Sequence, residues 1–220
     1  MSTANTVAHP QHHSPLAHHF KDLGQQFDAA KMGIWLFILS EIMMFGGLFV
    51  AYIIFHGLYP KMFAEGAKFC DWRFGATNTA DLIISSFSMA CAVYYAQTNQ
   101  TKKSIICMSI TAALGVVFLI IHGIEYHDIW KLGLLPEHYF RYKGPHAKNL
   151  AMFFALYFIM TGLHGLHVTV GVCLIIWMII RSKRGEFNSE YYTPVELTGL
   201  YWHFVDIIWI FLFPLLYLVG

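Results

Sequence analysis

The chain has 220 residues, of which 57% are hydrophobic, 17% aromatic and only 12% charged. Soluble domains carry about 25% charged residues, so this composition does not supply an ordinary water-facing surface. The formal net charge of +1 gives no basic patch for nucleic acid, and we expect no nucleic-acid partner. The sequence therefore predicts an integral membrane protein without a sizeable soluble domain.

The first 30 residues are polar and rich in histidine, and we expect them to form a disordered tail. Their histidines lack regular spacing, so a plain solvated tail is favoured over a dedicated metal site. We expect no cleavable signal peptide, because the first apolar run is too long for one. The predicted division is a tail over residues 1–30 and a membrane domain over residues 31–220.

Five apolar runs follow, each long enough to cross a bilayer core of about 30 Å as a helix. No alternating pattern of the membrane-barrel kind appears. The second run begins with Asn78-Thr79, polar residues that suit the start of a helix. We expect an all-α bundle of five transmembrane helices over about residues 33–56, 79–97, 104–127, 149–180 and 197–219.

The orientation depends on where lysine and arginine are densest, because their totals divide evenly between the two sides. Lys102-Lys103 and the segment Arg181-Ser-Lys-Arg184 lie closest to span ends. Short loops rich in lysine and arginine stay in the cytoplasm. This predicts a cytoplasmic N-terminus and a C-terminus on the outside.

Ionisable residues inside the apolar runs are the candidate functional residues. A charge at the centre of a bilayer costs at least about 2.5 kcal/mol, so by default it marks a functional site. Glu41 stands out, because an apolar run surrounds it; its alternative role is a protonated packing group. The intramembrane candidates are Glu41, Glu125, His164, His167, His203 and Asp206, with Asp81 and His122 beside them.

Helical rise gives these residues approximate depths from the proposed cytoplasmic ends. At about 1.5 Å per residue, Glu41 and Asp206 lie about 13 Å deep and His203 about 9 Å. His167 lies at about 20 Å and Glu125 at about 30 Å. Hydrogen bonding or charge pairing among the first three is therefore geometrically feasible. We also expect Glu41 to be uncharged at pH 7, because an isolated carboxylate at that depth is costly.

Histidines inside a membrane bundle can bind haem when they face each other across helices. His164 and His167 are three residues apart on one helix, too close for two axial ligands of one haem. The cross-helix candidates fall at different depths, so interhelical hydrogen bonding is favoured over haem binding. The four cysteines show no C-x-x-C pair and predict neither a disulfide framework nor a metal site.

Two further features concern packing and lipid. Thr161, Gly165 and Thr169 form a stripe of small residues, a pattern typical of close helix approach. Arg181 lies at the cytoplasmic end of the fourth helix, where it either extends to the interface or contacts a lipid phosphate.

Nearly every intramembrane polar residue falls within five motifs, one in each predicted helix. The motifs are Lys31-Met-Gly-Ile-Trp-Leu-Phe-Ile-Leu-Ser-Glu41; Asn78-Thr79 with Ser85-Ser86; Leu114-Gly115 through Phe118 to Glu125-Tyr126; Thr161-Gly-Leu-His164-Gly-Leu-His167-Val; and Tyr201-Trp-His203-Phe-Val-Asp206-Ile-Ile-Trp209.

In this order the motifs resemble subunit III of the haem–copper oxidases, the cytochrome c oxidase type. The resemblance covers about residues 31–220 and corresponds to a short form without the first two of seven helices. His122 departs from the pattern, since members often carry Gln before the Glu-Tyr pair. The resemblance implies a non-redox accessory subunit of a proton-pumping terminal oxidase in a bacterial-type inner (cytoplasmic) membrane. That subunit stabilises the catalytic subunit, binds lipids and supports proton uptake or oxygen access during aerobic respiration.

The resemblance also implies partners and residue roles. The partners are oxidase subunits I and II, membrane phospholipids, and cytochrome c or quinol through the complex. The haems and copper lie in partner subunits, so this chain itself has no catalytic residue, metal ligand or cofactor. Glu41 matches a carboxylate modified by carbodiimides, and Arg181 matches a lipid-contacting arginine.

Two alternatives stay open. One is a subunit III-like partner of a quinol oxidase or a nitric oxide reductase. The other, from a different class, is a self-sufficient membrane b-type cytochrome or proton carrier that uses Glu41, His203 and Asp206.

Overall fold

The computed structural model describes residues 20–135, 147–189 and 191–218, which form six α-helices without a strand among them. In chain order these are α1 (Leu23–Leu58), α2 (Pro60–Ala67), α3 (Trp72–Gln97), α4 (Thr101–Lys131), α5 (Ala147–Lys183) and α6 (Thr193–Tyr217). All but α2 are long and apolar enough to cross a membrane, so the prediction of five spans is confirmed. The short helix α2 was not predicted, because its eight residues contain no apolar run. The predicted tail lies outside the described residues over its first 19 positions.

The first helix begins well before the apolar run that predicted it. It starts at Leu23, and the carboxylate of Asp22 accepts a hydrogen bond of 2.7 Å from the backbone N–H of Gln25. Such a cap satisfies a donor that the helix leaves free and places negative charge at the positive end of the helix dipole. The spanning helix therefore begins about ten residues before its apolar part. A depth counted from the start of the apolar run is smaller than one counted from the start of the helix.

The third helix also begins earlier than expected. Asp71 caps it and accepts a hydrogen bond of 2.9 Å from the backbone N–H of Arg73. The expected cap at Asn78-Thr79 is wrong, because Asn78 lies fully buried inside α3. Asn78 and Thr79, at the edge of the apolar run, therefore lie inside the helix and do not form its start.

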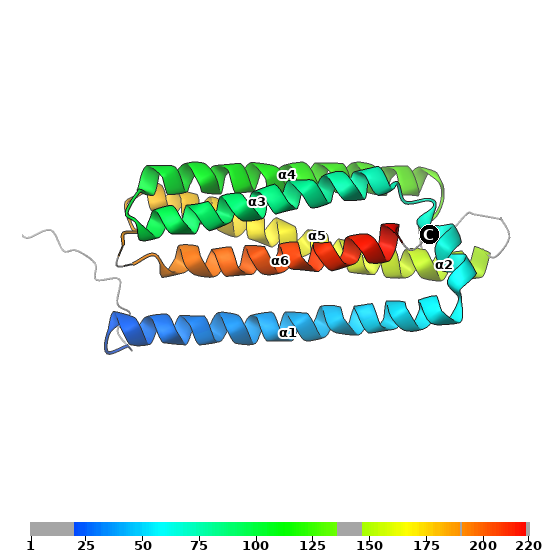
Figure 1. The fold of residues 1–220 in the computed structure, drawn as a ribbon, viewed down its shortest axis with the longest axis horizontal. Coiled ribbons are helices and arrows are strands. Elements are labelled where there is room, and N and C mark those ends of the chain that lie inside the picture. Colours follow the sequence, from blue (N-terminus) through cyan, green and yellow to red (C-terminus); the bar gives the residue numbers. More distant parts are fainter. Residues whose placement is uncertain (1–19, 136–146, 190, 219–220) are drawn as a thin grey trace, which may run out of the picture.

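Helices α3, α4, α5 and α6 pack into one bundle, and α1 lies along one side of it (Figure 1). α3 and α4 contact each other along most of their length, as expected for two spans joined by a tight turn. α1 contacts α5 and α6 and joins the bundle at one end through α2. Large apolar side chains cover the outside, which suits hydrocarbon and not water.

The centre of the bundle is built around Trp202 of α6. A Cβ atom added at Gly115 or at Gly171 would lie 2.7 or 2.8 Å from its ring. These two glycines therefore allow α4 and α5 to approach the indole. At Gly165, in the middle of the predicted stripe, an added Cβ would meet only the His122 ring at 3.9 Å.

Two tryptophans of α6 also bind α3 through their ring N–H groups. Trp202 donates to the hydroxyl of Ser85 at 3.1 Å, and Trp209 donates to the hydroxyl of Thr79 at 3.0 Å. Both rings are fully buried, so each polar atom that burial would otherwise isolate is satisfied. These bonds fix the axial position of α6 against α3.

Candidate functional site

Glu41 of α1 and His167 of α5 form a polar pair between the first helix and the bundle. Glu41 Oε2 lies 3.1 Å from His167 Nε2, and the two side chains are only 15% and 14% exposed. The ring of Phe45 packs edge-on against the imidazole at 5.4 Å between centroids. Glu41, the acid that an apolar run surrounds in the sequence, therefore has a polar partner in His167.

The other nitrogen of the imidazole determines how this pair holds its proton. His167 Nδ1 lies 2.7 Å from the carbonyl oxygen of Leu163, and a carbonyl only accepts, so Nδ1 carries a hydrogen. Nε2 then either accepts from a protonated Glu41 or donates as an imidazolium to a carboxylate. In both states the pair shares one proton across the 3.1 Å contact and has no net charge. This suits a location inside a membrane.

Two apolar grooves flank the contact between α1 and the bundle. One, of about 400 Å³, lies between α1, α5 and α6, and both Glu41 and His167 line it. The other, of about 470 Å³, lies between α1 and α6 and is lined almost entirely by apolar side chains, among them Phe45 and Phe211. Such grooves have the shape and polarity to hold acyl chains, and the polar pair lies at the wall of one of them.

His203 and Asp206 line a third groove, between α3 and α6, and His203 also lines the groove between α1 and α6. The hydroxyl of Ser86 is 2.7 Å from His203 Nδ1, and Ser86, His203 and Asp206 line a groove of about 350 Å³. The expected pairing of Glu41 with either of them is wrong, since its partner is His167. The reason is that both helices extend beyond the apolar runs from which the depths were counted. Along the helix axes, Glu41 lies about 27 Å from Leu23 and His167 lies about 24 Å from Lys183, so the two residues lie at nearly the same depth.

A second buried polar cluster lies toward the opposite end of the bundle, around Glu125 of α4. Tyr217 of α6 donates a hydrogen bond of 2.8 Å to Glu125 Oε2, and the Tyr157 hydroxyl is 3.2 Å from the Tyr217 hydroxyl. His122 Nδ1 is 3.6 Å from the same carboxyl oxygen, too far for a hydrogen bond. Glu125 thus lies in a three-helix polar network that is closed to lipid.

His164, the first histidine of the fourth motif, lies apart from the Glu41–His167 pair and from the network around Glu125. It is fully buried, and neither ring nitrogen has a hydrogen-bond partner among the described residues. Its ring packs against Phe118 at 5.4 Å and Trp209 at 5.1 Å. His164 and His167, on adjacent turns of one helix, therefore have different surroundings: an aromatic interior and a membrane-facing groove.

Arg181, the predicted lipid contact, has partners within the chain. Its Nε donates to Glu186 Oε2 at 2.6 Å, and its guanidinium lies over the rings of Trp177 and Phe187 at 5.3 and 5.0 Å. A clamp of this kind fixes the side chain at the end of α5. Its terminal nitrogens remain the groups that a phosphate would use.

Two contacts that position α1 were not predicted from the sequence. Lys31 forms an ion pair of 3.3 Å with Glu196 of α6, and Tyr52 donates a hydrogen bond of 2.5 Å to the backbone oxygen of Leu215. The second bond lies next to Pro214, inside α6. Nothing in the sequence indicates these pairs, because each joins helices far apart along the chain. The tyrosines around Glu125 were missed for the same reason.

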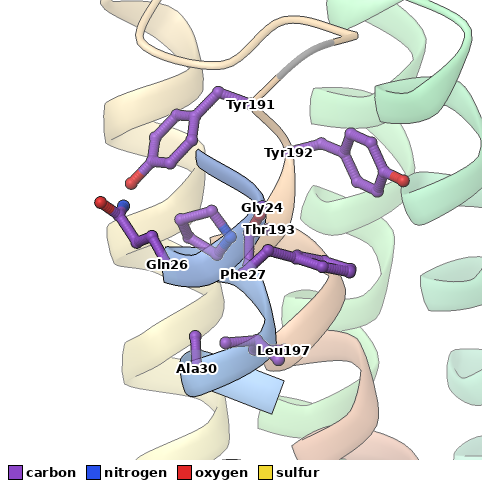
Figure 2. A pocket seen from close by; sticks show the side chains of 9 residues that line it. Gly24, Gln26, Phe27, Ala30, Tyr191, Tyr192, Thr193 and Leu197 are labelled. Carbon is purple, nitrogen blue, oxygen red and sulfur yellow. The ribbon is translucent and has the colours of Figure 1, made fainter. Parts of the chain in front are cut away.

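A further pocket of about 370 Å³ lies where the first turns of α1 meet the start of α6. Figure 2 shows the side chains that line it, among them Phe27 and Ala30 of α1 and Thr193 and Leu197 of α6. No acid, histidine or lysine lines it. Its mixture of aromatic, hydroxyl and apolar groups at two helix ends is typical of a membrane–water interface.

The described parts of the chain hold few clusters of metal-ligand side chains. No group of three or more His, Cys, Asp or Glu side chains is placed there to hold a metal ion. All four cysteines are free. Burial raises the pKa of the Cys70 thiol, which lies between α2 and α3, so this group stays protonated.

The fold and these contacts define a multi-pass membrane bundle with polar pairs between its helices and a groove on each side of α1. Comparison with known families agrees with this class. The family model for cytochrome c oxidase subunit III matches residues 17–220, nearly the whole chain. The chain belongs to this family, as the five motifs predicted.

Individual relatives are similar over most of their own length. A cytochrome c oxidase subunit 3 of Thermostichus vulcanus is 36% identical over 197 residues, which cover 87% of this chain and 88% of the relative. One from Synechocystis sp. is 34% identical over 193 residues, covering 87% and 76%. A probable quinol oxidase subunit 3 of Staphylococcus saprophyticus is 31% identical over 193 residues, covering 86% and 89%. The relatives are thus subunits of oxidoreductase complexes.

Proposed function

We propose that this chain is the non-redox, accessory subunit III of a proton-pumping haem–copper terminal oxidase in the inner membrane. The oxygen chemistry, with its haems and copper, then lies in subunit I and subunit II. The chain stabilises the catalytic subunit, holds phospholipid in the grooves beside α1 and supports proton uptake or oxygen access. Family membership supports this division of roles.

The observation that carries the proposal is the Glu41–His167 pair on a membrane-facing groove. A pair that holds one shared proton without net charge can keep a proton close to lipid at little electrostatic cost. Among the described residues, the groove beside the pair is lined mostly by apolar side chains, which favours a supporting role over catalysis. Arg181, at the end of α5, supplies a cation where lipid phosphates lie.

Removal of the chain from the purified complex tests the proposal. The complex, isolated through a tag on this chain, should contain a haem-bearing catalytic subunit and consume oxygen. After the chain is stripped with detergent, we expect the initial rate to persist and then to decline during turnover much faster than in the intact complex. A stripped complex that keeps its activity as long as the intact one would contradict the accessory role.

The electron donor separates the two oxidase alternatives. The relatives include both cytochrome c oxidase and probable quinol oxidase subunits, at 36% and 31% identity. Oxygen consumption by the purified complex with reduced cytochrome c, compared with a quinol, identifies the donor. An absorption spectrum of the isolated chain tests the cytochrome alternative, because bound haem would give a Soret band.

A further inference from the structure

Two buried histidines on adjacent helices, His122 of α4 and His164 of α5, are held by no hydrogen bond within the described chain. They are 5% and 0% exposed, and all four ring nitrogens lack a bonded partner among the described residues. Both imidazoles contact the same two rings, Phe118 and Trp209, at 5.1 to 5.8 Å between centroids. They therefore share one interior where α4, α5 and α6 meet. Buried polar atoms in native proteins are almost always bonded, so these four nitrogens require a partner.

Gly165, the residue after His164, leaves room in this interior. It is buried, yet a Cβ atom added there would meet, beyond its own helix and chain neighbours, only His122 Cδ2 at 3.9 Å. Cδ2 is bonded to Nε2, so this edge of the His122 ring faces α5. A water molecule needs about the room of a methyl group, and the space beside Gly165 accommodates one.

The hydroxyls one helical turn away on α5 do not serve the imidazoles. Thr161 donates to the carbonyl oxygen of Tyr157 at 2.6 Å, and its hydroxyl is also 2.6 Å from that of Tyr126. Thr169 donates to the carbonyl oxygen of Gly165 at 2.8 Å. Both hydroxyls are therefore engaged elsewhere, and the partner of the two rings comes from outside the chain's own side chains.

The chemistry of two imidazoles selects the partner. A neutral imidazole has one N–H donor and one acceptor nitrogen. Water both donates and accepts, so one molecule can accept from one ring and donate to the other. An acyl chain can do neither, and no group of three ligand side chains is placed to hold a metal ion among the described residues. Water is the small ligand that matches this site.

We propose that the space beside Gly165 binds an ordered water molecule that bridges the imidazoles of His122 and His164. The His122 ring then lies between this water and the carboxyl group of Glu125, which is 3.6 Å from His122 Nδ1. The small residue in the middle of the α5 stripe thus provides room for a ligand and not for a closely packed helix. The site is independent of the proposed function of the chain.

A cryo-EM map of the wild-type chain, purified with the subunits that accompany it, tests this site at a resolution that shows ordered water. We expect one peak beside Gly165, at about 2.7 to 3.2 Å from a nitrogen of each ring. An interior without a peak, or two rings bonded directly to each other, would overturn the proposal. So would a peak at about 2.0 to 2.1 Å from a ring nitrogen, because that distance indicates a metal ion.

Gly165→Ala supplies an independent measurement, because it fills the space. In a dry interior the new methyl group would make only ordinary contacts and should leave the midpoint of thermal unfolding unchanged or raise it. With water displaced, the imidazoles lose their partner, and the midpoint should fall by at least about 2 °C. Gly123→Ala on α4, where a Cβ meets no atom within 4 Å, is the matched control. A Gly165→Ala chain as stable as the control would contradict the proposal.

A second background separates loss of water from simple crowding. His164→Phe keeps a ring at this position and removes two of the unpaired nitrogens. Gly165→Ala made in the His164→Phe chain should therefore lower the midpoint less than it does in the wild-type chain. An equal decrease in both backgrounds would mean that the methyl group itself is the cause, and the proposal would fail.

Discussion

Three acids of the membrane domain differ in what surrounds them. Glu41 is paired with the His167 imidazole, Glu125 accepts a hydrogen bond from Tyr217, and Asp206 lies buried beside the Ser86 hydroxyl. A carboxyl group inside a membrane is stable when it is protonated or matched by a donor. Each of these acids therefore lies against a polar group of a neighbouring helix of the same chain.

The Glu41–His167 pair predicts that charge at Glu41 is dispensable. Glu41→Gln keeps a polar group within reach of His167 Nε2, so assembly and the initial rate of oxygen reduction should match wild type. Glu41→Leu leaves that nitrogen unpaired and should lower the free energy of unfolding by about 0.6 to 1.7 kcal/mol. Thermal unfolding of the purified complex measures this, and the infrared carboxylic-acid band lost in Glu41→Gln reports the proton. Immediate loss of turnover in Glu41→Gln would show that the charge is required.

The network around Glu125 should contribute measurably to stability. Tyr217→Phe removes the hydroxyl that bonds both Glu125 and Tyr157, and leaves the buried carboxyl without its donor. We expect the free energy of unfolding to fall by about 1 to 2 kcal/mol, from two hydrogen bonds of about 0.6 kcal/mol each and one unsatisfied group. Tyr94→Phe, at an exposed tyrosine on α3, is the control and should change little.

At the scale of helices, close approach at glycine is determined by the large ring that faces it and not by a stripe of small residues. The spacing of Thr161, Gly165 and Thr169 predicted a packing face, but an added Cβ would come closest to an aromatic ring at other glycines: Gly66, Gly75, Gly115 and Gly171. A sequence pattern shows which positions are small, whereas the shape of the opposing side chain decides which of them must be small.

Two glycines of α4 offer a matched test of this point. In Gly115→Ala the added methyl would lie 2.7 Å from both Trp202 and Val172, and should destabilise the bundle by about 1 to 3 kcal/mol. In Gly123→Ala the methyl meets no atom within 4 Å, so stability should be unchanged or slightly higher. Thermal unfolding of both variants in detergent measures the difference. Equal effects would mean that Trp202 moves aside.

The same scale shows what could be predicted from the sequence. The five spans and the family followed from apolar runs and ordered motifs, because both are local in the chain. The partner of Glu41 did not follow, since its depth was counted from the apolar run and not from the cap at Asp22. The tyrosine network around Glu125 was also out of reach, because its members meet only after three helices have packed.

For the whole molecule, the distribution of cations supports one orientation. The start of α1, the α3–α4 turn with Lys102 and Lys103, and the end of α5 lie at the same end of the bundle (Figure 1). Arg181 and Lys183 belong to that end as well. This gathering of basic residues near short connections supports the proposal that this end faces the cytoplasm.

Reporter fusions at the C-terminus check the orientation. With the proposed topology, green fluorescent protein fused after residue 220 should be dark, because it is exported unfolded, and alkaline phosphatase there should be active. The same reporters after Thr98, in the α3–α4 turn, should give the opposite result. A fluorescent C-terminal fusion would reverse the topology.

Three of the polar contacts of α1 have a consequence for membranes of different thickness. Lys31, Glu41 and Tyr52 attach this helix to the bundle at its start, middle and far portion. A slide of one helical turn, about 5.4 Å, would break all three contacts together. A helix of 36 residues that exceeds the hydrocarbon core therefore cannot adjust by sliding. Thicker or thinner bilayers must be matched by tilting α1 and the bundle as one body, so the polar pairs keep their partners while lipid composition changes.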